Sequence, residues 1–113
     1  MAQITTESVN GKKVVHLSGQ FIGGEHTDEL RDTLKKISEQ EDNNIVVDFK
    51  EVTYLNSTAI GVLISAHASF VKRGGRIVIC NVNKSIENIF VITKLTLVFT
   101  IKDTVEEALK TLN

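Results

Sequence analysis

Residues 54–70, YLNSTAIGVLISAHASF, mark the point at which one expected element ends and the next begins. Three polar residues, Asn56, Ser57 and Thr58, stand together directly before a run in which apolar residues recur at helical spacing. All three residue types favour the start of a helix, where their side chains accept hydrogen bonds from backbone N–H groups that have no partner within the helix. The stretch therefore predicts a helix that begins near Ser57 with hydroxyl groups at its amino end.

The apolar positions of this helix predict which face is buried. From Ile60 onward they fall at 60, 63, 64, 67, 70 and 71, and Gly74-Gly75 supplies a carboxyl-terminal stop. The opposite face is then expected to carry Val62, Ser65, Ser69 and Lys72. An exposed Val62 near the hydroxyl groups suits a protein partner, and a lone surface valine without function is the alternative.

The flanking segments alternate between strand and helix patterns. Residues 3–9 and 13–21 flank Asn10-Gly11, a strong hairpin signal, and the apolar runs at 43–49, 76–82 and 97–101 are typical of strands. Helices are expected from about Thr27, from Ser85 and over 104–112, with Thr27 and Ser85 as caps. This order predicts an α/β fold in which a mixed, mostly parallel sheet opens with an N-terminal hairpin and is accompanied by about four α-helices.

Composition narrows the class of protein. A chain of 113 residues fits one domain, expected to span 1–113, and its 42% hydrophobic content is that of a globular protein. The net charge of -1, without a basic block, argues against nucleic-acid binding. Without an apolar run near 18 residues or a signal-peptide pattern, we expect no direct membrane insertion and a cytoplasmic location.

Motifs for catalysis or cofactor binding are missing from the sequence. It contains no GxxxxGK[ST], GxGxxG, GxSxG or HExxH pattern. His16, His26 and His67 are widely spaced, and Cys80 has no second cysteine, so we expect no metal, no cofactor and no enzyme activity. Cys80 is interpreted as a small apolar group in a strand, and His67 as a partly buried imidazole held by one hydrogen bond.

Beyond these patterns, essentially the whole chain resembles the STAS domain family, named for sulphate transporters and anti-sigma factor antagonists. The resemblance rests on LSGQF, IVVDF, YLNSTAIGVLI, KRGGRIVIC and the ending SIENIFVITKLTLVFTIKDTVEEAL. Members of similar length are anti-sigma factor antagonists, in which a helix begins with D-S-[ST]-G-[LI]-G and a partner kinase phosphorylates the first hydroxyl. The resemblance implies that Ser57 is the phosphoacceptor, with Thr58 as second choice.

The same resemblance implies a regulator that acts by protein contact and is not itself the catalyst. Its unphosphorylated form is expected to bind a kinase-type (GHKL) anti-sigma factor and so free a sigma factor, until phosphorylation ends the interaction. A serine phosphatase is a further candidate partner. The expected contact surface comprises Asn56, Ser57, Thr58, Ala59, Val62, Ser65 and Ser69.

Two departures from the family motif keep other functions open. Asn56 replaces an aspartate, and Ala59 replaces a glycine, adding a methyl group where a partner's backbone is expected to approach. They favour an alternative in which the domain is never phosphorylated and serves as a scaffold or as an accessory subunit of a membrane transport complex. A nucleotide-binding domain is a third possibility, for which the sequence supplies no phosphate loop.

Overall fold

The computed structural model describes residues 2–41 and 43–112, and within them the chain forms an α/β fold around one five-stranded sheet. The strands lie in sequence order and comprise β1 (Gln3–Val9), β2 (Lys12–Phe21), β3 (Asn44–Leu55), β4 (Arg76–Cys80) and β5 (Thr100–Lys102). β1 is antiparallel to β2, and the other neighbouring pairs are parallel. The predicted mixed, mostly parallel sheet with an N-terminal hairpin is confirmed.

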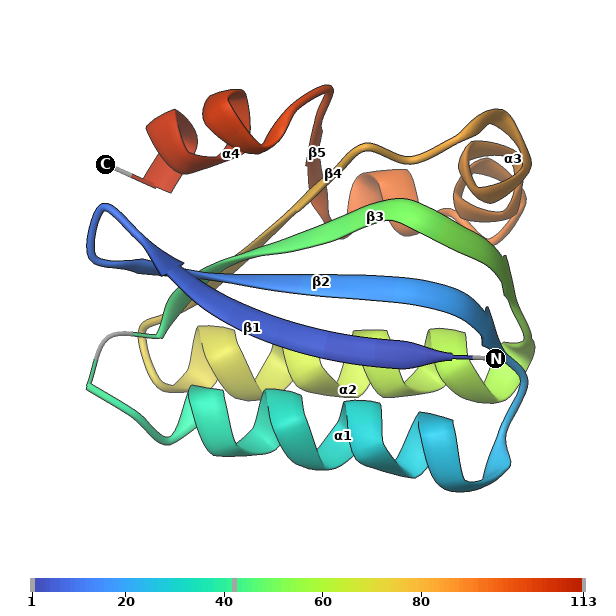
Figure 1. Cartoon of the computed structure of the whole chain (residues 1–113), viewed down its shortest axis with the longest axis horizontal. Helices are drawn as coiled ribbons and strands as arrows, with labels where there is room; N and C mark the ends of the chain where they lie inside the picture. Colours follow the sequence, from blue (N-terminus) through green and yellow to red (C-terminus); the bar gives the residue numbers. More distant parts are fainter. Residues whose placement is uncertain (1, 42, 113) are drawn as a thin grey trace.

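The helices cover the two faces of this sheet unequally. They comprise α1 (Gly24–Ser38), α2 (Ser57–Lys72), α3 (Lys84–Ile92) and α4 (Val105–Leu112), with a short 3-10 helix, η1 (Leu95–Leu97). Figure 1 shows α1 and α2 side by side along one face, the short α4 on the other, and α3 beside the carboxyl-terminal half of β3. The sheet face that α4 leaves uncovered over β1 and β2 carries exposed polar side chains such as Thr5 and Gln20.

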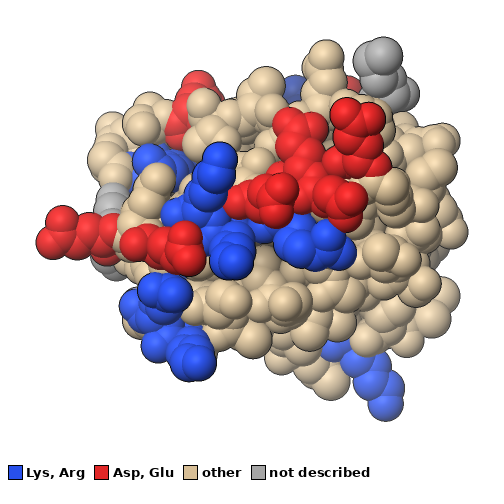
Figure 2. Space-filling view, turned by 90° about the horizontal axis from the view of Figure 1, so that it is seen from below, with Lys and Arg blue, Asp and Glu red and all other residues tan. Residues whose placement is uncertain are grey.

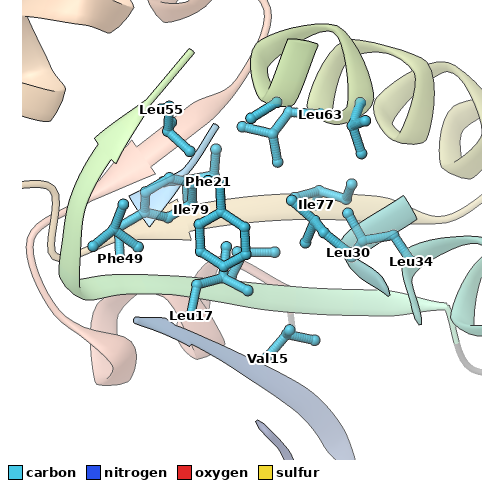
Figure 3. Packing of buried hydrophobic residues seen from close by; sticks show 14 of the residues in the cluster. Val15, Leu17, Phe21, Leu30, Leu34, Phe49, Leu55, Leu63, Ile77 and Ile79 are labelled. Carbon is cyan, nitrogen blue, oxygen red and sulfur yellow. The ribbon is translucent and has the colours of Figure 1, made fainter. Parts of the chain in front are cut away.

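Successive residues of the central strands pack into two separate hydrophobic cores. Val47 packs in the larger core beneath α1 and α2, whereas Val46 packs in the smaller core beneath α4. The larger core is filled from both strands and helices, with Leu17 and Phe21 facing Leu30 (Figure 3). Because successive side chains of a strand point to opposite faces, burial on both faces explains the continuous apolar run at 43–49.

The hairpin turn between β1 and β2 has the predicted form. Asn10 and Gly11 have φ angles of 52° and 79°, so both central residues lie in the left-handed region that a type I′ turn requires. Val9 pairs with Lys12 across the turn, and the register continues without interruption to Gln3 and Ser18. The Asn-Gly signal thus sets both the turn and the pairing of the first two strands.

Several predicted boundaries are wrong. β3 continues to Leu55, beyond the predicted end at 49, and β4 ends at Cys80 and not at 82. Three further differences have local reasons. α1 begins at Gly24, and Thr27 lies buried within it, where its hydroxyl accepts a hydrogen bond from the Gly23 N–H at 2.9 Å. Asn83, not Ser85, caps α3, because its Oδ1 reaches the Ile86 N–H at 3.0 Å. The strand predicted over 97–101 begins only at Thr100, because Leu97 ends η1 and the buried Leu95 and Phe99 are spaced for one turn of helix.

A polar network fastens β1, β2 and β3 to one another. His16 on β2 places Nδ1 2.7 Å from Asp48 Oδ2 and Nε2 2.8 Å from Glu7 Oε1. Burial opposes the charged imidazole, but the hydrogen bonds to Glu7 and Asp48 outweigh it and raise the pKa of His16. Burial likewise opposes ionisation of Asp48, yet hydrogen bonds from Asn81, the Lys50 N–H and His16 lower the pKa of its carboxyl group. The network is therefore held by an imidazolium between carboxylates.

This network predicts a pH dependence of stability. The pKa of His16 is higher in the folded protein than in the unfolded chain, where it is near 6.5. Protonation of His16 therefore stabilises the folded protein fully below pH 6.5, and this contribution is lost as the pH rises through the pKa of the folded state. We expect the free energy of unfolding in urea to fall between about pH 6 and 8, and His16→Gln to reduce this slope. Asp48, with a lowered pKa, acts in the opposite sense and loses its contribution as the pH falls below about 4. An unchanged slope in His16→Gln would contradict this account.

Replacing Gly75 and replacing Gly61 by alanine are expected to change the stability of the protein in opposite directions. A Cβ on Gly75 would lie 2.5 Å from the Asn43 backbone oxygen, whereas one on Gly61, inside α2, would meet nothing within 4 Å. We expect Gly75→Ala to lower the free energy of unfolding by about 2 kcal/mol and Gly61→Ala to raise it by about 0.5–1 kcal/mol. Urea titration of both variants measures these changes, and a Gly75→Ala variant as stable as wild type would refute the close contact.

Candidate functional site

The junction between β3 and α2 is organised by Asn56. Its backbone is extended, with φ -93° and ψ -179°, and its Oδ1 accepts a hydrogen bond from the Ala59 N–H at 3.0 Å. Its own N–H donates to the Phe21 carbonyl at the end of β2, at 3.0 Å. Asn56 is therefore the N-cap of α2, and Ser57 does not serve as the cap.

The Ser57 hydroxyl is left free by this arrangement. Ser57 is the first residue of α2 and is exposed, as is Thr58 after it. Among the hydrogen bonds of residues 2–41 and 43–112, none involves the Ser57 side chain. The first turn contains no acidic residue, so the partial positive charge of the helix amino end is not neutralised by a neighbouring carboxylate. The hydroxyl is thus accessible at a position that favours a negative charge.

The buried and exposed faces of α2 differ from those predicted. Ala59 and Val62 are buried, with Val62 only 4% exposed, whereas Ile64 and Val71 are 44% and 56% exposed. The expectations that Val62 is a surface aliphatic residue and that Ala59 joins the contact surface are wrong. The helix packs against α1 as well as the sheet, so its buried stripe is turned toward Val62. Ile64 and Val71 are the exposed aliphatic side chains that the sequence pattern missed.

The exposed residues of α2 from Ser57 to Val71 form one continuous surface, which we call the α2 face, and the exposed Lys72 follows at its carboxyl-terminal end. The α2 face consists of Ser57, Thr58, Gly61, Ile64, Ser65, Ala68 and Val71. No charged residue occurs between Ser57 and Val71. In Figure 2 the charged side chains crowd the neighbouring surface, where α1 lies, beside a broad uncharged area. An uncharged, partly apolar surface bordered by charges is typical of a protein contact site.

A groove separates the α2 face from α1. It has a volume of about 250 Å³ and a floor formed by Leu34, Val62 and Ala66. Arg31 and Lys35 line its α1 wall, and Ser65 and Ser69 line its α2 wall. Ser69, one of the predicted contact residues, is half-buried here, whereas Ser65 belongs to both the groove and the α2 face. The groove offers a short partner side chain an apolar floor and a basic wall.

His67 and Cys80 lie outside this surface. The partly buried His67 ring packs edge-on against Phe99 with 5.1 Å between centroids, and its Nδ1 is buried without a hydrogen-bond partner among the described residues, contrary to expectation. Burial, with smaller contributions from the charges of Asp48 and Glu106, raises the pKa of Cys80 to about 12. The thiol therefore stays protonated and behaves as the small apolar group that was predicted.

Comparison with known proteins identifies the family. The STAS domain model matches residues 3–108, and the chain therefore belongs to the STAS domain family. Helices long and apolar enough to cross a bilayer are not found in the part of the chain that the structure describes.

Solved structures share the fold at low sequence identity. An anti-sigma factor antagonist from Mycobacterium paratuberculosis has a TM-score of 0.85 and 19% identity, covering 99% of this chain and 94% of its own. The Bacillus cell fate determinant SpoIIAA, in its phosphorylated form, has a TM-score of 0.75 and 18% identity, covering 98% and 100%. The murine Solute Carrier 26 family member A9 anion transporter has a TM-score of 0.79 and 13% identity, with 94% of this chain matching 18% of the transporter.

The separate roles of Asn56 and Ser57 predict different effects of truncation. We expect Asn56→Ala to lower the free energy of unfolding by about 1 kcal/mol, because the Ala59 N–H loses its acceptor. Ser57→Ala is expected to change it by less than about 0.5 kcal/mol, since its hydroxyl makes no internal hydrogen bond. Urea unfolding of the pair measures the difference, and equal losses would contradict the assignment of Asn56 as the cap.

Proposed function

We propose that this protein is an anti-sigma factor antagonist that is switched by phosphorylation of Ser57, with Thr58 as the second-choice acceptor. In its unphosphorylated form it binds a kinase-type (GHKL) anti-sigma factor in the cytoplasm and frees a sigma factor. Residues 1–113 act as one domain that is a substrate and binding module, not an enzyme. The observation that carries the proposal is the exposed, unbonded Ser57 hydroxyl at the start of α2, on an uncharged surface.

The known structures support this proposal at the level of the fold. One structural neighbour is itself described as an anti-sigma factor antagonist, and another was solved in a phosphorylated form. Both align with nearly the whole of this chain. A phosphorylated domain of this fold is therefore stable enough to be studied, as the position of Ser57 at a helix amino end leads us to expect here.

A phosphate on Ser57 acts on the partner and leaves the fold intact. It adds a charge of about -1.5 to -2 near the unpaired N–H groups of the first turn of α2, which favour an anion. The one charged residue of α2 is Lys72, at the end of the helix away from Ser57, so a surface complementary to the helix around Ser57 is expected to be largely uncharged as well. Burying a phosphate there without a counter-charge opposes binding, and a serine phosphatase would restore the binding form.

The departures from the family motif do not obstruct this role. Asn56 supplies the cap through its Oδ1, so α2 begins correctly without an aspartate. The Ala59 side chain is buried, and its methyl group therefore does not project toward a partner. Gly61 is the exposed residue of the motif at which another backbone can approach closely, because a Cβ there would meet nothing within 4 Å.

The proposal predicts the behaviour of acceptor variants in partner capture. We expect Ser57→Asp to abolish capture of the GHKL kinase partner, because it places a permanent negative charge on the α2 face. Ser57→Ala should capture the partner but take up no phosphate from it in the presence of ATP, as read by intact mass. Thr58→Ala is the matched control and should both capture the partner and take up phosphate from it. Undiminished capture by Ser57→Asp would refute the switch.

A second candidate is an unmodified STAS module of a membrane transport complex. It is favoured by the match of 94% of this chain to part of a solute carrier anion transporter. Phosphopeptide mass spectrometry on protein from the native host distinguishes the two functions. Absence of phosphate at both Ser57 and Thr58 in all growth conditions, with co-purification of transporter subunits, would favour the transport role.

A further inference from the structure

β1 forms an open edge of the sheet. It is seven residues long and stands at one end of the strand order, paired only with β2. Figure 1 shows it at the front of the molecule, with no described segment alongside its outer edge. Within residues 2–41 and 43–112, the backbone hydrogen bonds made outside helices and sheets do not involve this strand. Its outward N–H and C=O groups are therefore available to another strand.

Most of the devices that usually protect an edge strand are missing from β1, whose single charged residue is Glu7. Its sequence, QITTESV, contains no proline, lysine or arginine, and its pairing with β2 shows no bulge. Four of its seven residues, Ile4, Thr5, Thr6 and Val9, are β-branched and favour extended backbone. The opposite edge, β5, has three residues and offers a much shorter template. β1 is thus the edge at which added pairing is favoured.

The hairpin fixes which groups of β1 point outward. Val9 and Lys12 flank a two-residue turn and form a hydrogen-bonded pair, as such hairpins require. Because bonded and non-bonded pairs alternate along antiparallel strands, the N–H and C=O groups of Ile4, Thr6 and Ser8 point away from β2. These three residues are the only ones in β1 whose backbone can bond a further strand.

From this pattern we propose that two copies of this chain associate through antiparallel pairing of β1, forming one continuous sheet about a two-fold axis at Thr6. Thr6 then pairs with Thr6 of the second copy, and Ile4 pairs with Ser8 in both directions. Every outward-facing residue meets another outward-facing residue, so each pair exchanges two hydrogen bonds. A single strand is self-complementary in this register, as a two-fold interface requires.

The charges of the chain agree with the same symmetry. Glu7, the one charged residue of β1, stands opposite Thr5 of the second copy and not opposite its own copy. A hollow on the outer side of α1 is lined by Glu25, Asp28, Glu29, Asp32, Thr33 and Lys36. The two-fold axis sets the two α1 helices antiparallel, so their acidic amino-terminal halves point in opposite directions. In this register no two like charges of β1 stand opposite each other.

This association is independent of the proposed switch. Pairing through β1 uses the edge of the sheet, whereas Ser57 lies at the start of α2 in the helix layer (Figure 1), so we expect the dimer to leave both copies of Ser57 exposed. A dimer presents two α2 faces to its partners. Ser57→Asp is therefore expected to dimerise like wild type even where it fails to capture the kinase partner, and each property fails or holds separately.

Sedimentation velocity over a concentration series tests the dimer. We expect wild type to show a monomer–dimer equilibrium with a Kd on the order of 100 µM or tighter. Thr6→Pro removes one outward N–H from each copy without removing a bond to β2, and Thr6→Lys sets like charges directly opposite each other. Each variant should weaken the dimer about tenfold or more while circular dichroism and urea unfolding stay close to those of wild type.

Thr5→Lys is the matched control. It adds the same charge one residue away, but in the proposed register Lys at 5 faces Glu7 of the second copy, so the dimer should persist or tighten. A wild-type chain that stays monomeric up to about 1 mM would overturn the proposal. It would also be overturned by dimers that tolerate both Thr6 variants, or by equal weakening in Thr5→Lys and Thr6→Lys.

Discussion

The double hydrogen bonding of Asn56 is the constraint on which the candidate site depends. Through its N–H it is tied to the Phe21 carbonyl at the end of β2, and through its Oδ1 it holds the Ala59 N–H in the first turn of α2. One residue therefore fixes the start of the helix against the sheet. Because Asn56 accepts the capping hydrogen bond, the Ser57 side chain is not needed as the N-cap. Its hydroxyl projects from a defined position at the start of a rigid helix. A helix capped by Ser57 itself would have turned that oxygen inward.

Local signals in the sequence predict the framework of the fold. The Asn10-Gly11 turn and the apolar runs of the central strands each reflect one dominant local constraint, positive φ in the first case and burial on both faces in the second. The alternation of strand and helix then restricts the topology. Those predictions hold because no distant contact competes with them. The missed caps of α1 and α3 show the opposite case, since Thr27 and Ser85 are plausible caps until Gly23 and Asn83 are placed in space.

The sequence pattern could not predict which face of α2 is buried, because apolar residues occur all around the helix. Val62 is buried against α1, yet Ile64 and Val71 are equally aliphatic and lie in solvent. Periodicity reports where apolar residues recur and does not report which neighbour will cover them. The better signal was the absence of charge from Ser57 to Val71, since a helix beside solvent usually carries charged residues on its outer face. That absence marks the surface that a partner is proposed to cover.

Gly61 connects the stability of α2 with its proposed role. A glycine inside a helix costs about 0.5–1 kcal/mol relative to alanine, and here no neighbouring atom lies within 4 Å of the position that a Cβ would occupy. Packing within the chain therefore gives no reason for it. It lies one turn beyond Ser57 on the same exposed surface, where a missing side chain lets another backbone come close to the proposed acceptor. The helix is less stable than it need be at a residue beside the proposed phosphoacceptor, as expected if this surface is shaped by contact with a partner more than by folding.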